Sequence, residues 1–115
     1  MRYAIVSVDH RGRFTDQSLV RALGWRPRDR VDIGVSCGAV IIQAHHEGVF
    51  ALNARGHVPI PAAVRRWCAV GAGDRVLLAA APERGVLVVH TMAALDAMVV
   101  GYHAGLAGGE HDDQS

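Results

Sequence analysis

The sequence predicts a mostly β domain with short helices, built from two tandem repeats and followed by a C-terminal helix. Three observations lead to this prediction. Alternating apolar and polar residues, typical of half-buried strands, form segments separated by glycine-containing turns. Short helical patterns interrupt these strands at two matching places. The order strand, Arg-Gly turn, short strand, helix and hairpin occurs twice along the chain.

The two repeats match residue by residue. Gly12 and Gly56 are 44 positions apart, and each follows an arginine. The spacing then becomes 45, so that Arg21 matches Arg66 and an Asp-Arg-Val sequence recurs. We divide the chain into a first repeat (1–47), a second repeat (48–90), a C-terminal helix (91–104) and a tail (105–115) whose composition predicts disorder. Because neither repeat can bury its sheet alone, we expect one shared core.

Each repeat has the same expected elements. A first strand covers residues 3–8 in one repeat and 49–53 in the other. A brief helix follows, with Asp16 as a plausible N-cap in the first repeat and Pro61 in the first helical turn of the second. Hairpins then pair residues 31–35 with 39–43, and residues 76–81 with 86–89. Thr91 is a candidate cap of the last helix.

The second helix has an apolar stripe that predicts its orientation. Val64, Trp67 and Cys68 have the spacing of one helix face, so we expect Trp67 in the core. The adjacent Arg65 and Arg66 then lie off the buried side. Arg21 occupies the corresponding place in the first repeat.

Charge is unevenly distributed along the 115 residues. The formal net charge is +1, yet all twelve basic residues are arginine. Residues 1–109 hold these twelve arginines and eight acids, a net charge of +4. Arginine suits bidentate contacts to phosphate and guanine, although GC-rich codons are the safer explanation for composition alone. The positions of the arginines must therefore decide between nucleic-acid binding and codon usage.

Several other classes of protein are disfavoured. The first residues lack the apolar region of a signal peptide, and polar residues interrupt the most apolar span (86–107), so we expect a cytoplasmic protein. Cys37 and Cys68 are expected to be buried thiols. We expect no metal, because the seven histidines lack ligand spacing, and no other cofactor. Motifs of hydrolases and nucleotide-binding enzymes are missing from the sequence, so catalysis is not expected.

The second repeat resembles a known family. The stretch RGHVPIPAAVRRWCAVGAGDRVLL is similar to the AbrB/MazE/SpoVT family of swapped-hairpin DNA-binding domains. The resemblance is carried by Gly56, Ile60-Pro61, Arg65-Arg66 and Gly73-Asp74. In the first repeat it is carried by Gly12-Arg13, Arg21, Leu23-Gly24 and Asp29, without an Ile-Pro step. It extends over about residues 4–90.

The resemblance implies both a fold and a function. In that family two chains interleave their hairpins into one cradle-loop barrel, which this duplicated chain could build from its two ββαββ-type repeats. The turns and helix starts would then form one basic DNA-binding surface. The residues expected to contact DNA are Arg11, Arg13, Arg21, Arg55, His57, Arg65 and Arg66. His57, in the second repeat, replaces the family's usual Arg or Lys, so a weaker contact is expected there. In the first repeat Asp16 would repel phosphate and the helix has one arginine where the second repeat has two, so the first repeat is expected to bind DNA less strongly.

Three functions remain open at this point. The first is a sequence-selective DNA-binding transcriptional regulator, associated with the nucleoid. The second is an antitoxin-like module, although a short tail with few apolar anchors disfavours a toxin partner. The third is a protein-interaction barrel with weak or no DNA binding. We also expect a homodimer that forms through the apolar face of the C-terminal helix.

Overall fold

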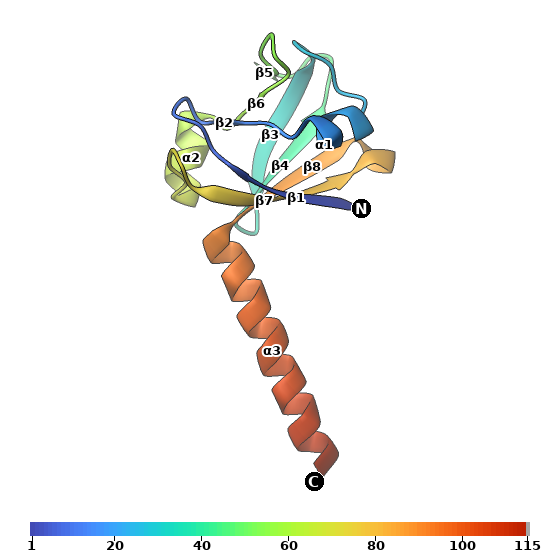
Figure 1. Cartoon of the computed structure of the whole chain (residues 1–115), viewed down its shortest axis with the longest axis vertical. Coiled ribbons are helices and arrows are strands. Elements are labelled where there is room, and N and C mark those ends of the chain that lie inside the picture. Colours follow the sequence, from blue (N-terminus) through green and yellow to red (C-terminus); the bar gives the residue numbers. More distant parts are fainter. Residues whose placement is uncertain (115) are drawn as a thin grey trace.

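The chain folds into a β-rich body from which one long helix projects (Figure 1). A computed structural model describes residues 1–114, and side chains are described up to residue 106. In chain order the elements are β1 (Arg2–Ser7), β2 (Arg13–Phe14), α1 (Gln17–Ala22), β3 (Arg30–Ser36), β4 (Ala39–Ala44), β5 (Phe50–Ala51), β6 (Val58–Pro59), α2 (Ala62–Cys68), β7 (Arg75–Ala81), the 3-10 turn η1 (Pro82–Arg84), β8 (Val86–Thr91) and α3 (Met92–Gln114).

The strands form one six-stranded sheet and one separate pair. The order in the large sheet is β1-β7-β8-β4-β3-β5, and all of its neighbours are antiparallel. β2 pairs with β6. The mostly β prediction and both predicted hairpins are therefore confirmed. The large sheet is not closed into a barrel, since β1 and β5 are its two edges and do not pair with each other.

The strand order has an internal two-fold pattern. Exchanging β1 with β5, β3 with β7 and β4 with β8 reproduces the same order, read from the opposite edge. The first strand of each repeat pairs with the hairpin of the other repeat: β1 with β7, and β5 with β3. The two repeats are therefore interleaved, and neither contains all the partners of its own strands.

The turns before the hairpins repeat the same main-chain hydrogen bonds. Asp29 Oδ2 accepts from the N–H of Arg26 at 2.8 Å, and Asp74 Oδ2 accepts from the N–H of Gly71 at 2.8 Å. The preceding residue has a positive φ in both repeats, 71° at Arg28 and 84° at Gly73. The shared Asp-Arg-Val sequence thus marks one local structure that occurs twice.

The core lies where the two repeats meet. It is built from the inward positions of the hairpins, the helix α1 and the segments next to the short strands. The side chains that are almost fully enclosed are Val8, Val31, Val40, Ile42, Leu52, Val58, Val76, Leu78, Leu87 and Val89. Most of them are β-branched, which suits a pleated, half-buried surface.

The two short helices differ in how they are buried. In α1, Asp16 Oδ1 accepts from the N–H of Leu19 at 2.9 Å, so the predicted N-cap is confirmed. The prediction that Trp67 of α2 belongs to the core is wrong, because this side chain is 80% exposed. The chain reverses at Ala69, which has a φ of 54°, and Val70 is buried instead of the tryptophan. Half-buried Val64 and Cys68 already supply the contacts of α2 with the core.

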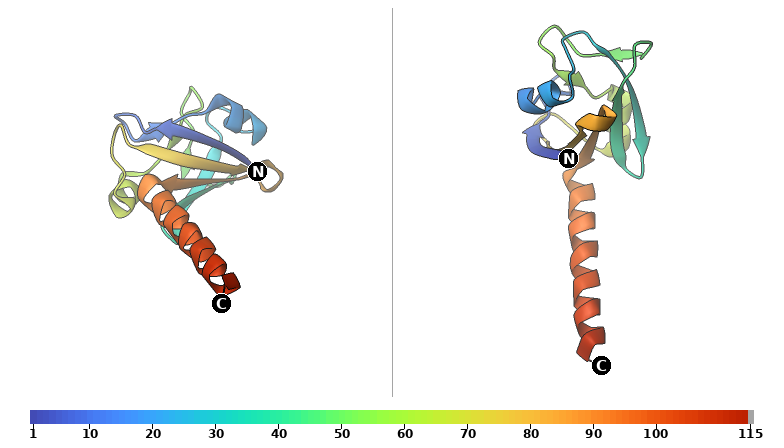
Figure 2. Two further views of the ribbon diagram at one scale, coloured as in Figure 1. Left: turned by 60° about the horizontal axis from the view of Figure 1, so that its bottom comes forward. Right: turned by 90° about the vertical axis from the view of Figure 1, so that its right-hand side faces the viewer.

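Helix α3 starts as expected and ends later than expected. Thr91 Oγ1 accepts from the N–H of Ala94 at 3.0 Å, which confirms the predicted cap. The helix continues through residues 105–114, for which disorder was expected, and residue 115 lies outside the described part. No proline interrupts this segment, so the ladder of main-chain hydrogen bonds can extend through its glycines. α3 contacts β7 and β8 near its start and then leaves the body (Figure 2).

Among the residues that the structure describes, no helix has both the length and the apolar character needed to cross a bilayer.

Candidate nucleic-acid interface

Two matched turns form the centre of the candidate interface. In the Asp9–Arg13 turn, Asp9 Oδ1 accepts from the N–H groups of Arg11 at 2.9 Å and Arg13 at 2.8 Å. Gly12 has a φ of 77°, a conformation that favours glycine. The geometry of this turn is therefore fixed by an acceptor at its first position and a glycine at its fourth.

The Asn53–His57 turn has the same construction. Asn53 Oδ1 accepts from the N–H groups of Arg55 and His57, both at 2.9 Å. Gly56 again has a φ of 77°. Each turn is also closed by a main-chain hydrogen bond from its first residue to the carbonyl of its fifth. An arginine therefore stands at the tip of each turn, on the same backbone geometry.

The two turns lie side by side although they are distant in sequence. The strands that leave them, β2 and β6, pair with each other, and residues of both turns line one shallow depression. Arg11 and Arg55 are exposed there, whereas Arg13 and His57 are half-buried. Four of the seven residues predicted to bind DNA thus share one surface, and they come from both repeats.

The helix arginines occupy two different environments. Arg21 in α1 and Arg66 in α2 are exposed, as predicted. Arg65 is half-buried: its Nε donates to the carbonyl oxygen of Ile60 at 3.0 Å. A Cβ atom placed on Gly12 would clash with the Arg65 side chain, so the guanidinium packs closely over this glycine. The prediction that Arg65 lies off the buried side is corrected, because its guanidinium connects α2 to the Asp9–Arg13 turn.

One acid lies within the basic surface. The pKa of Asp9 is held below its usual value, chiefly by the hydrogen bond from the N–H of Arg13 and also by that from Arg11. This carboxylate is therefore ionised at neutral pH and adds a negative charge beside Arg11 and Arg13. The corresponding Asn53 makes the same hydrogen bonds without a charge. Asp16, in contrast, is engaged in capping α1.

Asp9 is not among the residues predicted from the sequence, although the sequence contains a signal for its role. Asp9 and Asn53 are 44 residues apart, the same spacing as the two turn glycines. Extending the match between the repeats by two residues beyond Arg11 and Arg55, toward the N-terminus, aligns them. Both residue types accept hydrogen bonds from main-chain N–H groups two residues on, which is typical of such turns.

The two cysteines differ in how far they are buried. Cys68 is half-buried, but Cys37 is exposed, so its predicted burial is wrong. Cys37 lies at the tip of the β3–β4 hairpin with a φ of 52°, away from the sheet core.

The rings of His45 and His46 are stacked with centroids 5.3 Å apart. Within the described part of the chain, no three His, Cys, Asp or Glu side chains come together as a metal site.

Comparison of the chain with protein-family models, with curated proteins and with solved structures finds no match.

Proposed function

We propose that the protein binds double-stranded DNA as a transcriptional regulator of AbrB type, and that its interleaved repeats, whose six-stranded sheet is open at β1 and β5, are a variant of the cradle-loop barrel of that family. The observation that carries the proposal is the pair of matched turns. Each places an exposed arginine, Arg11 or Arg55, at its tip on a backbone fixed by a glycine and a side-chain acceptor. Arginine held in this way can form bidentate contacts to phosphates and to guanine edges.

The exposed helix arginines extend the same interface. Arg21 and Arg66 occupy matching positions on two short helices, each of which follows one of the turns. Arg65 contributes by positioning the Asp9–Arg13 turn, and its remaining guanidinium nitrogens can still reach a phosphate. The proposed recognition surface is therefore pseudo-two-fold, with a more positive half that belongs to the second repeat.

Substitution of the helix arginines tests the proposal. We expect Arg66→Ala and Arg21→Ala to weaken binding to the DNA upstream of the protein's own gene, as measured by electrophoretic mobility shift. The plot of log affinity against log salt should flatten by about 0.9 for each phosphate that is no longer neutralised. Arg84→Ala, in the exposed η1 turn, is the control and should change neither quantity. Unchanged affinity and slope in both variants would favour the protein-interaction function instead.

The same proposal includes a homodimer that forms through α3. This helix carries exposed apolar side chains on the part that leaves the body: Met98, Val99, Val100, Tyr102 and Leu106. Its separation from the sheet supports pairing with a second copy over a role as a cover for its own body. Light scattering should report a dimer for the full chain and a monomer for a chain that ends at Thr91. A truncated chain that stays dimeric would contradict this role of α3.

A further inference from the structure

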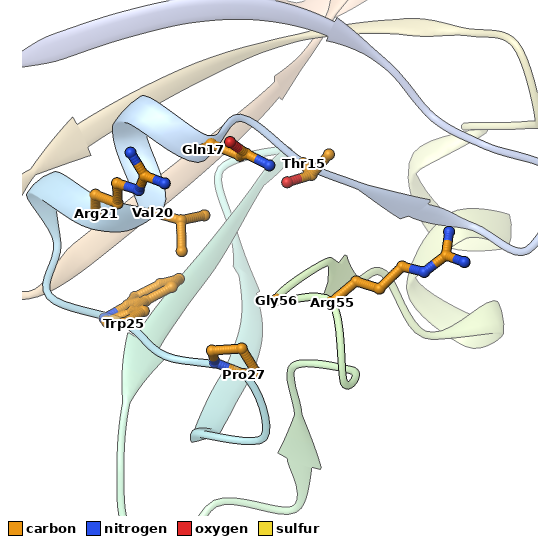
Figure 3. Close-up of a pocket in the computed structure, with 8 residues that line it drawn as sticks. All are labelled: Thr15, Gln17, Val20, Arg21, Trp25, Pro27, Arg55 and Gly56. Atoms are coloured by element: carbon orange, nitrogen blue, oxygen red, sulfur yellow. The ribbon is translucent and has the colours of Figure 1, made fainter.

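A hollow beside α1 extends as far as a turn glycine. It has a volume of about 200 Å³ and lies between α1, the segment after it and the Asn53–His57 turn (Figure 3). Its apolar part is lined by Val20, Trp25 and Pro27, and Gly56 forms part of its edge. An apolar lining with a few polar groups is typical of small-molecule sites, and the volume limits the occupant to a small ligand.

Comparison of the repeats shows why the hollow reaches the turn. At the 45-residue spacing, Val20 corresponds to Arg65. In the second repeat the Arg65 side chain covers Gly12, and the depression beside α2 does not include this glycine in its lining. In the first repeat Val20 is too short to cover Gly56, and a Cβ atom added there would have Pro27 Cγ as its nearest neighbour, at 3.9 Å. The space that an arginine fills in one repeat is thus left available in the other.

The polar groups around the hollow indicate the charge of its occupant. Two arginines, Arg21 and Arg55, line it, and no acid does so. They stand on different sides of the hollow (Figure 3). Both side chains are exposed, so rotation about their flexible stems can bring the guanidinium groups over the opening. A carboxylate is the small group that pairs best with two guanidinium groups.

A buried donor in the wall adds a second observation. The Trp25 side chain is buried, and in the described part of the chain its Nε1–H has no hydrogen-bond acceptor. A buried indole N–H without a partner is uncommon and needs a physical explanation, such as an acceptor supplied by a ligand. The Trp25 side chain lines the hollow, so a ligand that enters it lies against this residue.

We propose that this hollow binds a small aromatic carboxylate, with its ring against Val20, Trp25 and Pro27 and its carboxylate between Arg21 and Arg55. The volume suits a single ring with one acidic group. Because both arginines also belong to the proposed DNA surface, an occupied hollow would lower DNA affinity, and this consequence rests on the proposed function. Ligand binding itself does not rest on the proposed function, because it is measured without DNA.

Benzoate is a suitable probe, with benzamide as the uncharged molecule of the same shape. The measurement uses the full chain with Trp67→Phe, because Trp67 is exposed and Trp25 is then the remaining tryptophan. We expect benzoate to produce a saturable change in Trp25 emission, and benzamide to bind about tenfold more weakly or worse. Arg55→Met should weaken benzoate binding by a similar factor, while Arg84→Met should leave it unchanged. Absence of saturation, or equal binding of benzoate by the Arg55→Met variant, would overturn the proposal.

Closing the hollow gives an independent test. Val20→Arg introduces the residue that fills the corresponding space in the second repeat, so benzoate binding should disappear while the far-ultraviolet circular dichroism stays unchanged. Retained benzoate binding in a folded Val20→Arg chain would contradict the proposed location. If this variant does not fold, Arg55→Met and Arg84→Met still decide the question. If the parent chain binds benzoate but not DNA, the hollow is supported and the DNA proposal is contradicted. If it binds DNA but not benzoate, the DNA proposal is supported and the hollow is contradicted.

Discussion

The first and second repeats share a backbone and differ in the side chains placed on it. Both form the same closed turn with a glycine at a φ of 77°, and both brace the turn before their hairpin with an aspartate. At two of the positions where they differ, one repeat has a charge that the other lacks: Asp9 against Asn53, and Val20 against Arg65. The turn glycines and the aspartates before the hairpins therefore specify the shared backbone, while side chains at other positions can differ between the repeats.

The consequences of these two differences are local. Asp9 lowers the positive potential of the first turn, while Asn53 keeps the same hydrogen bonds without a charge. Arg65 closes the second repeat over Gly12, while Val20 leaves a hollow beside Gly56. The second repeat is thus the more positive one, and the proposed small-molecule site lies between α1 of the first repeat and the Asn53–His57 turn of the second.

The largest expected effect concerns the interleaving of the two repeats. Residues 1–47 expressed alone should remain unfolded, because β1 pairs with β7 and the outer side of β3 pairs with β5. Circular dichroism and thermal melting of this fragment provide the measurement. A cooperative melting transition of a monomeric fragment would show that a repeat can bury its own sheet, which contradicts the shared core.

A second prediction compares the two turn glycines. Gly56→Ala should destabilise the fold by about 1–2 kcal/mol, because alanine is strained at this positive φ. Gly12→Ala should cost about 1 kcal/mol more, since its methyl group displaces Arg65 and breaks the hydrogen bond to Ile60. Urea unfolding of both variants measures the difference. Equal destabilisation would mean that Arg65 does not hold the first turn.

The smallest expected effect is an exchange of charge between the turns. Asp9→Asn should raise DNA affinity about threefold at low salt, and Asn53→Asp should lower it by a similar factor, because both residues keep the turn acceptor. Fluorescence anisotropy with a labelled duplex is a suitable measurement. Shifts in the same direction for both variants would indicate an effect on folding and would contradict the electrostatic explanation.

Acid should affect the two turns differently. The pKa of Asp9 is depressed, so its contribution to stability is present above its usual pKa of 3.8 and is lost as the pH falls through its lower value in the folded protein. Asn53 does not titrate in this range. In Asp9→Asn this part of the acid destabilisation should therefore be absent, which acid titrations monitored by circular dichroism can detect.

Local patterns in the sequence predicted the elements well, and the error at Trp67 arises where α2 ends. The hairpins and the N-cap Asp16 depend on alternation and on neighbouring residues, so they could be identified without a structure. Trp67 had the spacing of a core residue, but the reversal at Ala69 gives the buried place to Val70. Such a competition between neighbouring apolar residues cannot be resolved from the spacing of a single helix.

The candidate site was predictable in part for the same reason. The repeat identified Arg11 and Arg55 as equivalent residues at exposed turn tips. It did not show that Arg65 would turn back onto Gly12, because this contact joins segments separated by more than fifty residues. The hollow beside Val20 exists because the first repeat lacks the matching contact with Gly56, so it could be recognised only by comparing the two folded repeats.

The central claim is that the paired turns bind DNA through their arginines, and the salt dependence of DNA affinity tests it most directly. The double variant Arg11→Ala/Arg55→Ala removes both turn tips, and Arg2→Ala/Arg84→Ala removes the same charge elsewhere on the surface. We predict that the slope of log affinity against log salt falls by about 1.8 in the first variant and stays unchanged in the second. Equal slopes in the two variants, or a parent chain that does not bind DNA, would contradict the claim.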